Sequence, residues 1–234
     1  MSSYSILGRV RVLVRYISKA KTRHGIHSPF VYEFIEQVIQ NRSGLGAANE
    51  VENLRRDLLN DQSLINYDDF GATGQSGHFT VSKICKKAAK SPLYTRLLYR
   101  ISKKYKPTNI LELGTSLGIS ASALATGNRN SRIISIEGSK EIAEKAKANF
   151  EKLNLDSVQV NHGLFDEVLP TILINDIKFD LIYIDGNHSY EATKRYVEML
   201  KPFLADQACI ILDDIHWSAG MEKIWDELVN NSEI

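Results

Sequence analysis

The stretch ILELGTSLGIS, residues 110–120, decides the fold of this chain. A short apolar run carries an acid, Glu112, near its end, and Gly114 and Gly118 follow where a helix should begin. Glycine at such a turn lets a ligand approach the main chain, and the N–H groups that open the next helix can receive ligand oxygens. The stretch therefore predicts a strand, a ligand-binding turn and a helix.

The spacing of these glycines discriminates between classes of ligand. A dinucleotide site has three glycines, G-x-G-x-x-G, that cradle a pyrophosphate. This chain has E-x-G-x-x-x-G, without a glycine two positions after Gly114. An acid beside the glycine repels a pyrophosphate and suits a ligand that carries an ammonium and a sulfonium. The pattern disfavours NAD and FAD.

Strand-like and helix-like segments alternate from Asn109 onward. Short runs rich in Ile, Val and Leu predict strands at 109–113, 132–137, 157–162, 180–185 and 208–214. Helical patterns lie between and after them, at 118–126, 139–153, 165–175, 189–201 and 218–230. Such alternation predicts an α/β fold with a Rossmann-like, doubly wound parallel sheet.

The part before Asn109 has a mostly helical pattern. Apolar stripes at 6–17 and after Ser28-Pro29 predict two helices, and further helices are expected at 50–60 and 91–105. The glycine- and hydroxyl-rich segment 68–80 predicts a mobile loop. We therefore expect a helical N-terminal extension, residues 1–94, and a ligand-binding domain, residues 95–234.

The composition is that of an ordinary globular protein. Of 234 residues, 43% are hydrophobic and 24% charged, and the net charge of +1 makes a nucleic-acid partner unlikely. Residues 1–30 hold six basic side chains and no acidic one. A solvated helix face explains this asymmetry better than contact with phosphate, an anionic lipid surface or an acidic partner.

The cysteines and the hydropathy pattern limit the cellular context. Cys85 and Cys209 are too few for a disulfide framework and form no zinc pattern, and Cys209 lies in an apolar run that predicts a core position. The sequence has no apolar run of membrane-spanning length and no secretory signal, so we expect a cytoplasmic protein.

Several predicted strands end in acids that should face the ligand. Glu137 ends the second strand, 23 residues after Gly114, where its carboxylate can accept both hydroxyls of a ribose. An exposed acid at a strand end is the alternative. Asp185 follows the fourth strand, and Asp213 and Asp214 follow the fifth. Because ligands bind at the carboxyl ends of parallel strands, these acids should converge.

Three converging carboxylates repel one another unless a cation lies between them. Oxygen ligands suit a hard divalent ion such as Mg²⁺, so Asp185, Asp213 and Asp214 are the predicted metal ligands. Such an ion lowers the pKa of a bound hydroxyl, and His188 can take its proton, which makes His188 and Asp185 the predicted catalytic residues. Alternatively, Asp185 binds the cofactor and His188 caps the next helix. His216 has weaker support.

The whole series resembles the class I S-adenosylmethionine-dependent methyltransferases over about residues 95–230. LELGTSLG (111–118) is similar to their first motif, which implies that Glu112, Gly114, Thr115, Ser116 and Gly118 bind S-adenosylmethionine. Glu137 matches the ribose-binding acid, and NHGLFDEVLP (161–170) resembles the adenine-lining segment, which implicates Gly163, Leu164 and Phe165. Asp185 is expected to contribute to the same cofactor site.

The resemblance also implies the strand order 3-2-1-4-5, followed by a two-strand hairpin. The sequence stops at Ile234 without such a hairpin. Strands 6 and 7 are therefore expected to be absent or truncated, and a partner such as a second copy is another way to cover the sheet edge.

The stretch IDGNHSY (184–190) resembles metal-assisted small-molecule O-methyltransferases, in particular the branch with macrolide-sugar O-methyltransferases and cephalosporin-hydroxylase-like proteins. This implies methyl transfer to an oxygen of a small molecule, with help from a divalent cation. Catechol- and caffeoyl-type relatives have Asp-Asn where this chain has Asp213-Asp214.

HGIHSPFVY (24–32) and DFGATGQSGHF (69–79) resemble uncharacterised methyltransferase-like proteins of Bacteroidetes-type bacteria. In small-molecule O-methyltransferases, segments before the first strand often cover the active site, so 68–80, with His78 and Phe79, is expected to form part of a lid. Two alternatives stay open. One is an RNA or protein methyltransferase, and the other is a cofactor-binding relative without catalysis.

Overall fold

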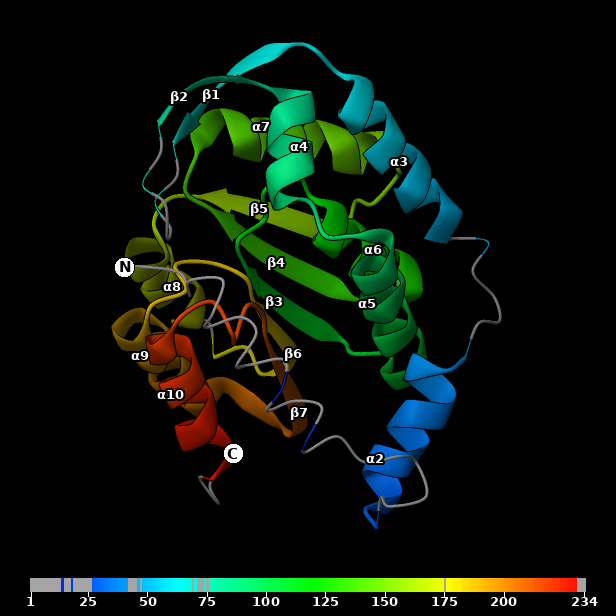
Figure 1. The fold of residues 1–234 in the computed structure, drawn as a ribbon, viewed down its shortest axis with the longest axis vertical. Coiled ribbons are helices and arrows are strands. Elements are labelled where there is room, and N and C mark those ends of the chain that lie inside the picture. Colours follow the sequence, from blue (N-terminus) through cyan, green and yellow to red (C-terminus); the bar gives the residue numbers. More distant parts are fainter. Residues whose placement is uncertain are drawn as a thin grey trace.

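A parallel sheet of five strands forms the centre of the molecule (Figure 1). The computed structural model describes residues 14, 18, 27–41, 46, 48–68, 70, 74, 76–174 and 176–230. The sheet strands are β3 (Asn109–Leu113), β4 (Arg132–Glu137), β5 (Val158–His162), β6 (Phe179–Ile184) and β7 (Leu204–Leu212). Their order is β5-β4-β3-β6-β7, so the five strands, counted along the chain, run 3-2-1-4-5 across the sheet.

The central strand β3 is buried on both faces, which explains its apolar sequence. It pairs in parallel with β4 on one side and with β6 on the other. Leu111 and Leu113 pack into the cluster on one face of the sheet, and Ile110 packs into the cluster on the other face. Burial on both faces requires an uninterrupted apolar run, and Glu112 is the exception that needs hydrogen-bond partners.

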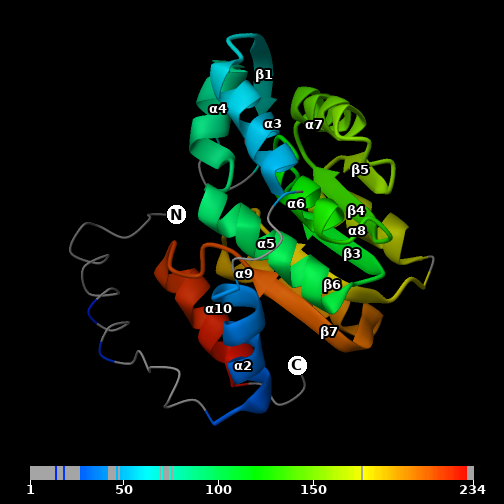
Figure 2. The ribbon, with the colours of Figure 1, turned by 90° about the vertical axis from the view of Figure 1, so that its right-hand side faces the viewer.

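Helices cover both faces of this sheet (Figures 1 and 2). One face carries α5 (Pro92–Tyr105), α6 (Ile119–Gly127) and α7 (Lys140–Lys152), whose apolar side chains share one core cluster. The other face carries α8 (Phe165–Leu173), α9 (Tyr190–Leu200) and α10 (Ala219–Val229), and η3 (Lys201–Phe203) leads into β7. The described residues include no helix with the length and apolar composition needed to cross a membrane.

The N-terminal part contributes α2 (Pro29–Phe34), η2 (Ile35–Ile39), α3 (Ala48–Asn60) and α4 (Val81–Ala88). Apolar residues of α3 and α4 form one cluster with Leu117, Ile119 and Ile142, so these helices share a core with the sheet domain. Helix α4 was not predicted from the sequence. The apolar stripe at 6–17 lies outside the described residues, apart from Val14.

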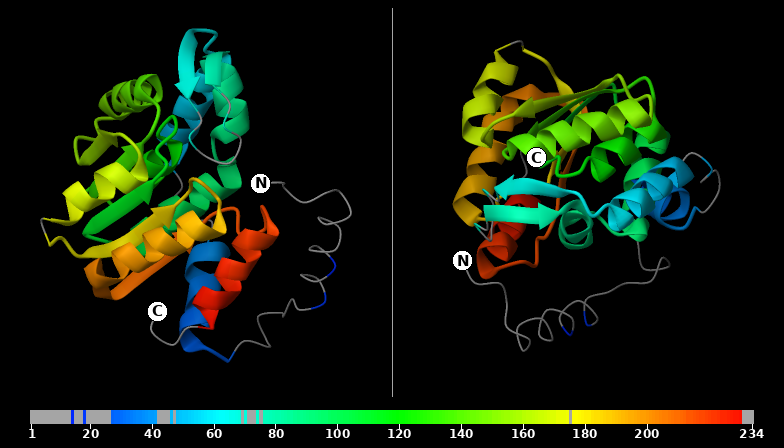
Figure 3. Two further views of the ribbon diagram at one scale, coloured as in Figure 1. Left: turned by 90° about the vertical axis from the view of Figure 1, so that its left-hand side faces the viewer. Right: turned by 90° about the horizontal axis from the view of Figure 1, so that it is seen from above.

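The segment predicted as a loop, 68–80, instead belongs to an antiparallel hairpin. Strands β1 (Leu64–Asp68) and β2 (Ser76–Thr80) pair with Leu64 opposite Thr80, and the hairpin lies alongside α7 (Figure 3). The N–H of Asn66 donates to the carboxylate of Glu141 at 2.6 Å. The described part of the chain thus has seven strands, and two of them, outside the parallel sheet, were not predicted, because each has only five residues and β2, SGHFT, is mostly polar.

The prediction that Cys209 lies in the core is wrong, because this residue belongs to the edge strand β7. Cys209 was predicted to lie in the core, but its side chain is exposed, whereas Cys85 is buried. The described residues leave β7 with one strand neighbour, β6. A strand at the edge of a sheet is less completely covered than a central one, so its apolar sequence does not guarantee burial.

At Gly114, the end of β3 lies in close contact with the end of β6. Its φ of 102° is open to glycine and rarely adopted by other residues. A Cβ atom at this position would collide with the carbonyl oxygen of Asp185. The main-chain N–H of Gly114 donates to the carbonyl of Ile136 at 3.0 Å, which ties the same turn to β4. The absence of a side chain thus allows three strand ends to meet.

We expect Gly114→Ala to destabilise the protein by roughly 2–4 kcal/mol, because backbone strain and a steric collision add up. Thermal unfolding followed by circular dichroism measures the change. Gly46→Ala is the matched control, since no atom lies within 4 Å of the Cβ position there. Equal unfolding temperatures for the two variants would contradict the importance of this contact.

Candidate active site

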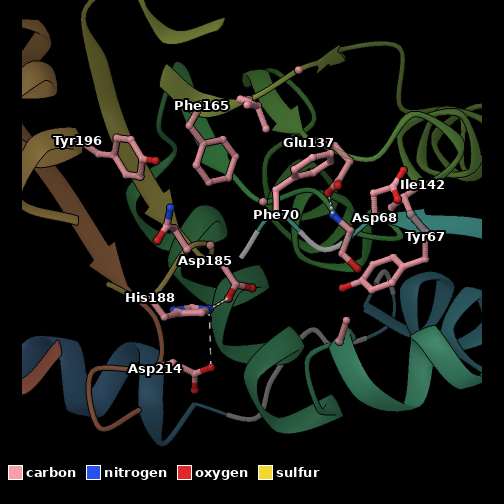
Figure 4. Close-up of a pocket in the computed structure, with 18 of the residues that line it drawn as sticks. Tyr67, Asp68, Phe70, Glu137, Ile142, Phe165, Asp185, His188, Tyr196 and Asp214 are labelled. Carbon is pink, nitrogen blue, oxygen red and sulfur yellow. Dashed lines mark hydrogen bonds and ion pairs between the residues drawn. The ribbon is translucent and has the colours of Figure 1, made fainter. Parts of the chain in front are cut away.

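A cavity of about 540 Å³ opens where the sheet strands end (Figure 4). Its walls come from the turns after β3, β4, β5 and β6, from the β1–β2 hairpin, and from the connection between α4 and α5. In Figure 4, Asp185, His188 and Asp214 lie in a row on one side, while Glu137, Ile142 and Tyr67 lie on another. Ligand sites of parallel α/β sheets occupy this edge.

Six of the predicted cofactor residues line this cavity at the turns after β3, β4 and β5: Gly114, Ser116, Glu137, Gly163, Leu164 and Phe165. The carboxylate of Glu137 is held in place by main-chain donors. One oxygen accepts the N–H of Ser116 at 2.8 Å, and the other accepts the N–H of Ser139 at 2.9 Å. Two such bonds fix the orientation of a carboxylate that faces the cavity.

Glu112, Thr115 and Gly118 do not line the cavity but build the turn beneath it. Glu112 is fully buried, and the hydroxyls of Ser120 and Ser135 each donate to one of its oxygens at 2.5 Å. Thr115 shares a hydrogen bond with Ser135. Burial, opposed by the two serine hydroxyls, raises the pKa of Glu112 to about 8. This acid is therefore protonated at neutral pH.

The acidic side of the cavity contains a lysine that sequence reasoning missed. The Lys90 ammonium lies 3.0 Å and 2.9 Å from the two carboxylate oxygens of Asp185, and it also contacts Asp213. The hydroxyl of Tyr183 donates to Asp185 at 3.3 Å and to Asp213 at 3.4 Å. Lys90 and Asp185 line the cavity, while Asp213 lies outside its lining.

His188 faces two carboxylates without a close hydrogen bond to either. Its Nε2 lies 3.8 Å from Asp185 and 3.9 Å from Asp214 (Figure 4). Next to it, the indole N–H of Trp217 is buried and has no partner among the described residues, and Trp217 lines the cavity. His216 instead pairs with Glu222 at 2.9 Å and lies outside the lining.

The predicted divalent cation does not fit these residues. Lys90 already occupies the space between Asp185 and Asp213, while Asp214 faces His188. In the described ranges, no group of three His, Cys, Asp or Glu side chains is arranged to hold a metal ion. Lys90 lies 95 positions before Asp185 and is one of several lysines in KKAAK (86–90), so no sequence signal singled it out.

The hairpin contributes to the cavity through residues other than those predicted. Tyr67, Asp68 and Phe70 line it, and the Phe70 ring packs so closely on Gly138 that a Cβ atom there would collide with it. His78 and Phe79 were the expected lid residues, but neither lines the cavity. Phe79 packs edge-to-face on Tyr67, with ring centres 5.9 Å apart.

Residues 111–215, which include the turns after β3, β4, β5, β6 and β7, match the family described as "Methyltransferase domain". The chain is also 34% identical over 144 residues to "O-methyltransferase hkm8" of Aspergillus hancockii. That match covers 58% of this chain and 56% of the relative, so the chain spans little more than half of the curated protein.

Solved structures with the same fold cover more than this domain. An O-methyltransferase from Bacillus cereus in complex with SAH has a TM-score of 0.59 at 20% identity, over 87% of this chain and 86% of that chain. The O-methyltransferase TomG from Streptomyces achromogenes, in complex with SAM, has a TM-score of 0.56 at 19% identity, over 91% of this chain and 89% of that chain. The likeness therefore includes most of the segment before β3.

We expect Glu112→Gln to flatten the pH dependence of stability. The folded-state pKa of about 8 exceeds the ordinary 4.5, so below pH 4.5 the carboxyl is protonated in both the folded and the unfolded chain, and the protein has its full stability there. Stability is then lost as pH rises from about 4.5 to 8, by an order of a few kcal/mol. Glutamine keeps the shape without a charge to desolvate, so the variant should be the more stable protein at pH 8.

Urea unfolding at pH 5, 6, 7 and 8 measures this effect, and Glu144→Gln on the exposed side of α7 is the matched control. A parallel pH profile for Glu112→Gln and the unmodified protein would show that the buried carboxyl does not titrate in this range.

Proposed function

We propose that this protein transfers a methyl group from S-adenosylmethionine to a hydroxyl oxygen of a small molecule. The observation that carries the proposal is a single cavity in a methyltransferase domain with two chemically different ends. One end has the glycine turn and the fixed carboxylate of Glu137. The other end has Lys90, Asp185 and His188.

The charge of the cavity supports a cationic cofactor. Its lining has five carboxylates, Asp68, Glu137, Asp166, Asp185 and Asp214, against two lysines, Lys87 and Lys90. A lining with an excess of carboxylates attracts a sulfonium and repels a pyrophosphate. In this proposal, Glu137 accepts the ribose hydroxyls, the segment 163–165 holds the adenine, and Gly114 and Ser116 lie against the methionine part.

The other end of the cavity suits a small acceptor with oxygen atoms. The whole cavity, cofactor end included, has a volume of about 540 Å³, which leaves room for a small acceptor only. Trp217 supplies aromatic surface beside His188, with ring centres 6.3 Å apart. In the proposed division, residues 95–234 hold most of the cofactor, Tyr67 and Phe70 of the N-terminal part line the same end of the cavity, and Lys90 reaches the acceptor end.

The transfer itself requires alignment and one proton acceptor. The acceptor oxygen attacks the methyl carbon, an O–C bond forms, and the S–C bond breaks to leave a neutral thioether. The hydroxyl proton passes to the neutral imidazole of His188 and from there to solvent. Asp185 and Asp214, 3.8 and 3.9 Å from Nε2, stabilise the imidazolium that forms. Holding both reactants in line supplies most of the acceleration.

Calorimetry with S-adenosylhomocysteine tests the cofactor site. We expect micromolar binding to the unmodified protein and roughly 100-fold weaker binding to Glu137→Ala, because two hydrogen bonds to a charged group are lost. Glu151→Ala, on the exposed side of α7, is the matched control. Absence of binding at about 1 mM ligand would sink the proposal.

Turnover tests the role of His188. With radiolabelled S-adenosylmethionine and a panel of phenols, catechols and sugars, His188→Ala should lose roughly 100-fold or more in kcat, as expected when a general base is removed. Its affinity for S-adenosylhomocysteine should stay unchanged, since the proton acceptor does not bind the cofactor. An unchanged kcat would assign the proton to another group.

A further inference from the structure

We propose that Lys90 is the resident cation of the acceptor site, and that its ammonium holds the acceptor oxygen without a divalent metal ion. This inference rests on the proposed function, since it assigns a role at the acceptor end of the same cavity. It starts from the position of Lys90 between Asp185 and Asp213, the space in which the sequence predicted a metal ion.

The main chain around Lys90 is anchored from two sides. Its carbonyl accepts the Nε–H of Arg55 in α3 at 3.2 Å and the hydroxyl of Thr95 in α5 at 3.5 Å. Thr95 is fully buried, and its hydroxyl also donates to the carbonyl of Ser91. The connection between α4 and α5 therefore has a fixed position, and only the lysine side chain extends into the cavity.

The contacts of the ammonium leave it able to bind a ligand. Lysine has three N–H donors, and two carboxylates, Asp185 and Asp213, take up two of them. The hydroxyl of Tyr183 donates to the same two carboxylates and so gives each of them a further hydrogen bond. Lys90 lines the cavity with 17% of its side chain exposed, so its third N–H is available to an acceptor oxygen.

A positive charge at this place acts in the same direction as the predicted metal ion, since both stabilise negative charge on a bound oxygen. As the hydroxyl proton passes to His188, negative charge develops on the acceptor oxygen, and a preorganised ammonium stabilises it. Lys90 keeps its three protons throughout, because the imidazole of His188 is the proton acceptor. Asp185 orients both groups, since it contacts Lys90 directly and lies 3.8 Å from His188.

Mn²⁺ binding measured by electron paramagnetic resonance tests the inference without any acceptor. We expect no binding to the unmodified protein, to Lys90→Arg or to the control Lys86→Met, which lies on the exposed side of α4. Lys90→Met should bind Mn²⁺ measurably, at least about tenfold more tightly than the weakest binding that the experiment detects, because two carboxylates lose their cation. Adding Asp213→Asn to Lys90→Met should remove the new site. Binding to the unmodified protein that Asp185→Asn abolishes, or no gain in Lys90→Met, would overturn the inference.

Turnover gives a second readout. EDTA-treated enzyme should retain full activity, while Lys90→Met should lose roughly 100-fold in kcat, the usual effect of removing one donor to a developing oxyanion. Lys90→Arg should restore most of the loss, and binding of S-adenosylhomocysteine should stay unchanged in both variants. A merely structural lysine would not give this separation of kcat from cofactor affinity.

The outcomes separate the two proposals. If S-adenosylhomocysteine does not bind, the proposed function fails. If it binds but turnover needs Mg²⁺ after EDTA treatment, or if Lys90→Met is fully active, only the role of Lys90 fails. Should Lys90→Met not fold, Lys90→Met/Asp213→Asn takes its place in the turnover experiment, because it removes one of the two carboxylates left without a cation.

Discussion

The close contact between Gly114 and the carbonyl of Asp185 is the constraint on which the rest of the site depends. It brings the end of β3 against the end of β6, while the N–H of Gly114 binds the end of β4. Every proposed cofactor contact in the sheet domain lies on a turn that follows one of these strands or β5. A parallel sheet produces such convergence because all of its strands end at the same edge.

The carboxylates of this region show how environment decides the role of one residue type. Glu112 is buried beneath the turn, satisfied by two serine hydroxyls, and protonated at neutral pH. Glu137 faces the cavity and is held by two main-chain N–H groups. Asp185 is joined to an ammonium. The first stabilises a turn, the second presents a fixed acceptor to a ligand, and the third positions a cation.

The N-terminal part is more than a cover for the sheet domain. It shares a hydrophobic cluster with α6 and α7 and brings Tyr67, Phe70 and Lys90 to the cavity. Loops and extensions outside the common fold are where related enzymes differ in their acceptors, because they vary without disturbing the sheet. The chemistry of the acceptor end is therefore expected to depend on this part of the chain.

The sequence by itself determined the five parallel strands, the helices between them and the turns that carry Gly114, Glu137, Asp185 and His188. These features follow from local patterns, since the period of apolar residues and the position of glycine depend on neighbours along the chain. The hairpin was not predicted because its strands are short and one of them, β2, is mostly polar. Only the tertiary structure decided that Glu112 lies below the cavity and that Lys90 lies between Asp185 and Asp213. Both depend on contacts between residues far apart in the sequence, and side-chain charges reveal nothing of their partners until the chain has folded.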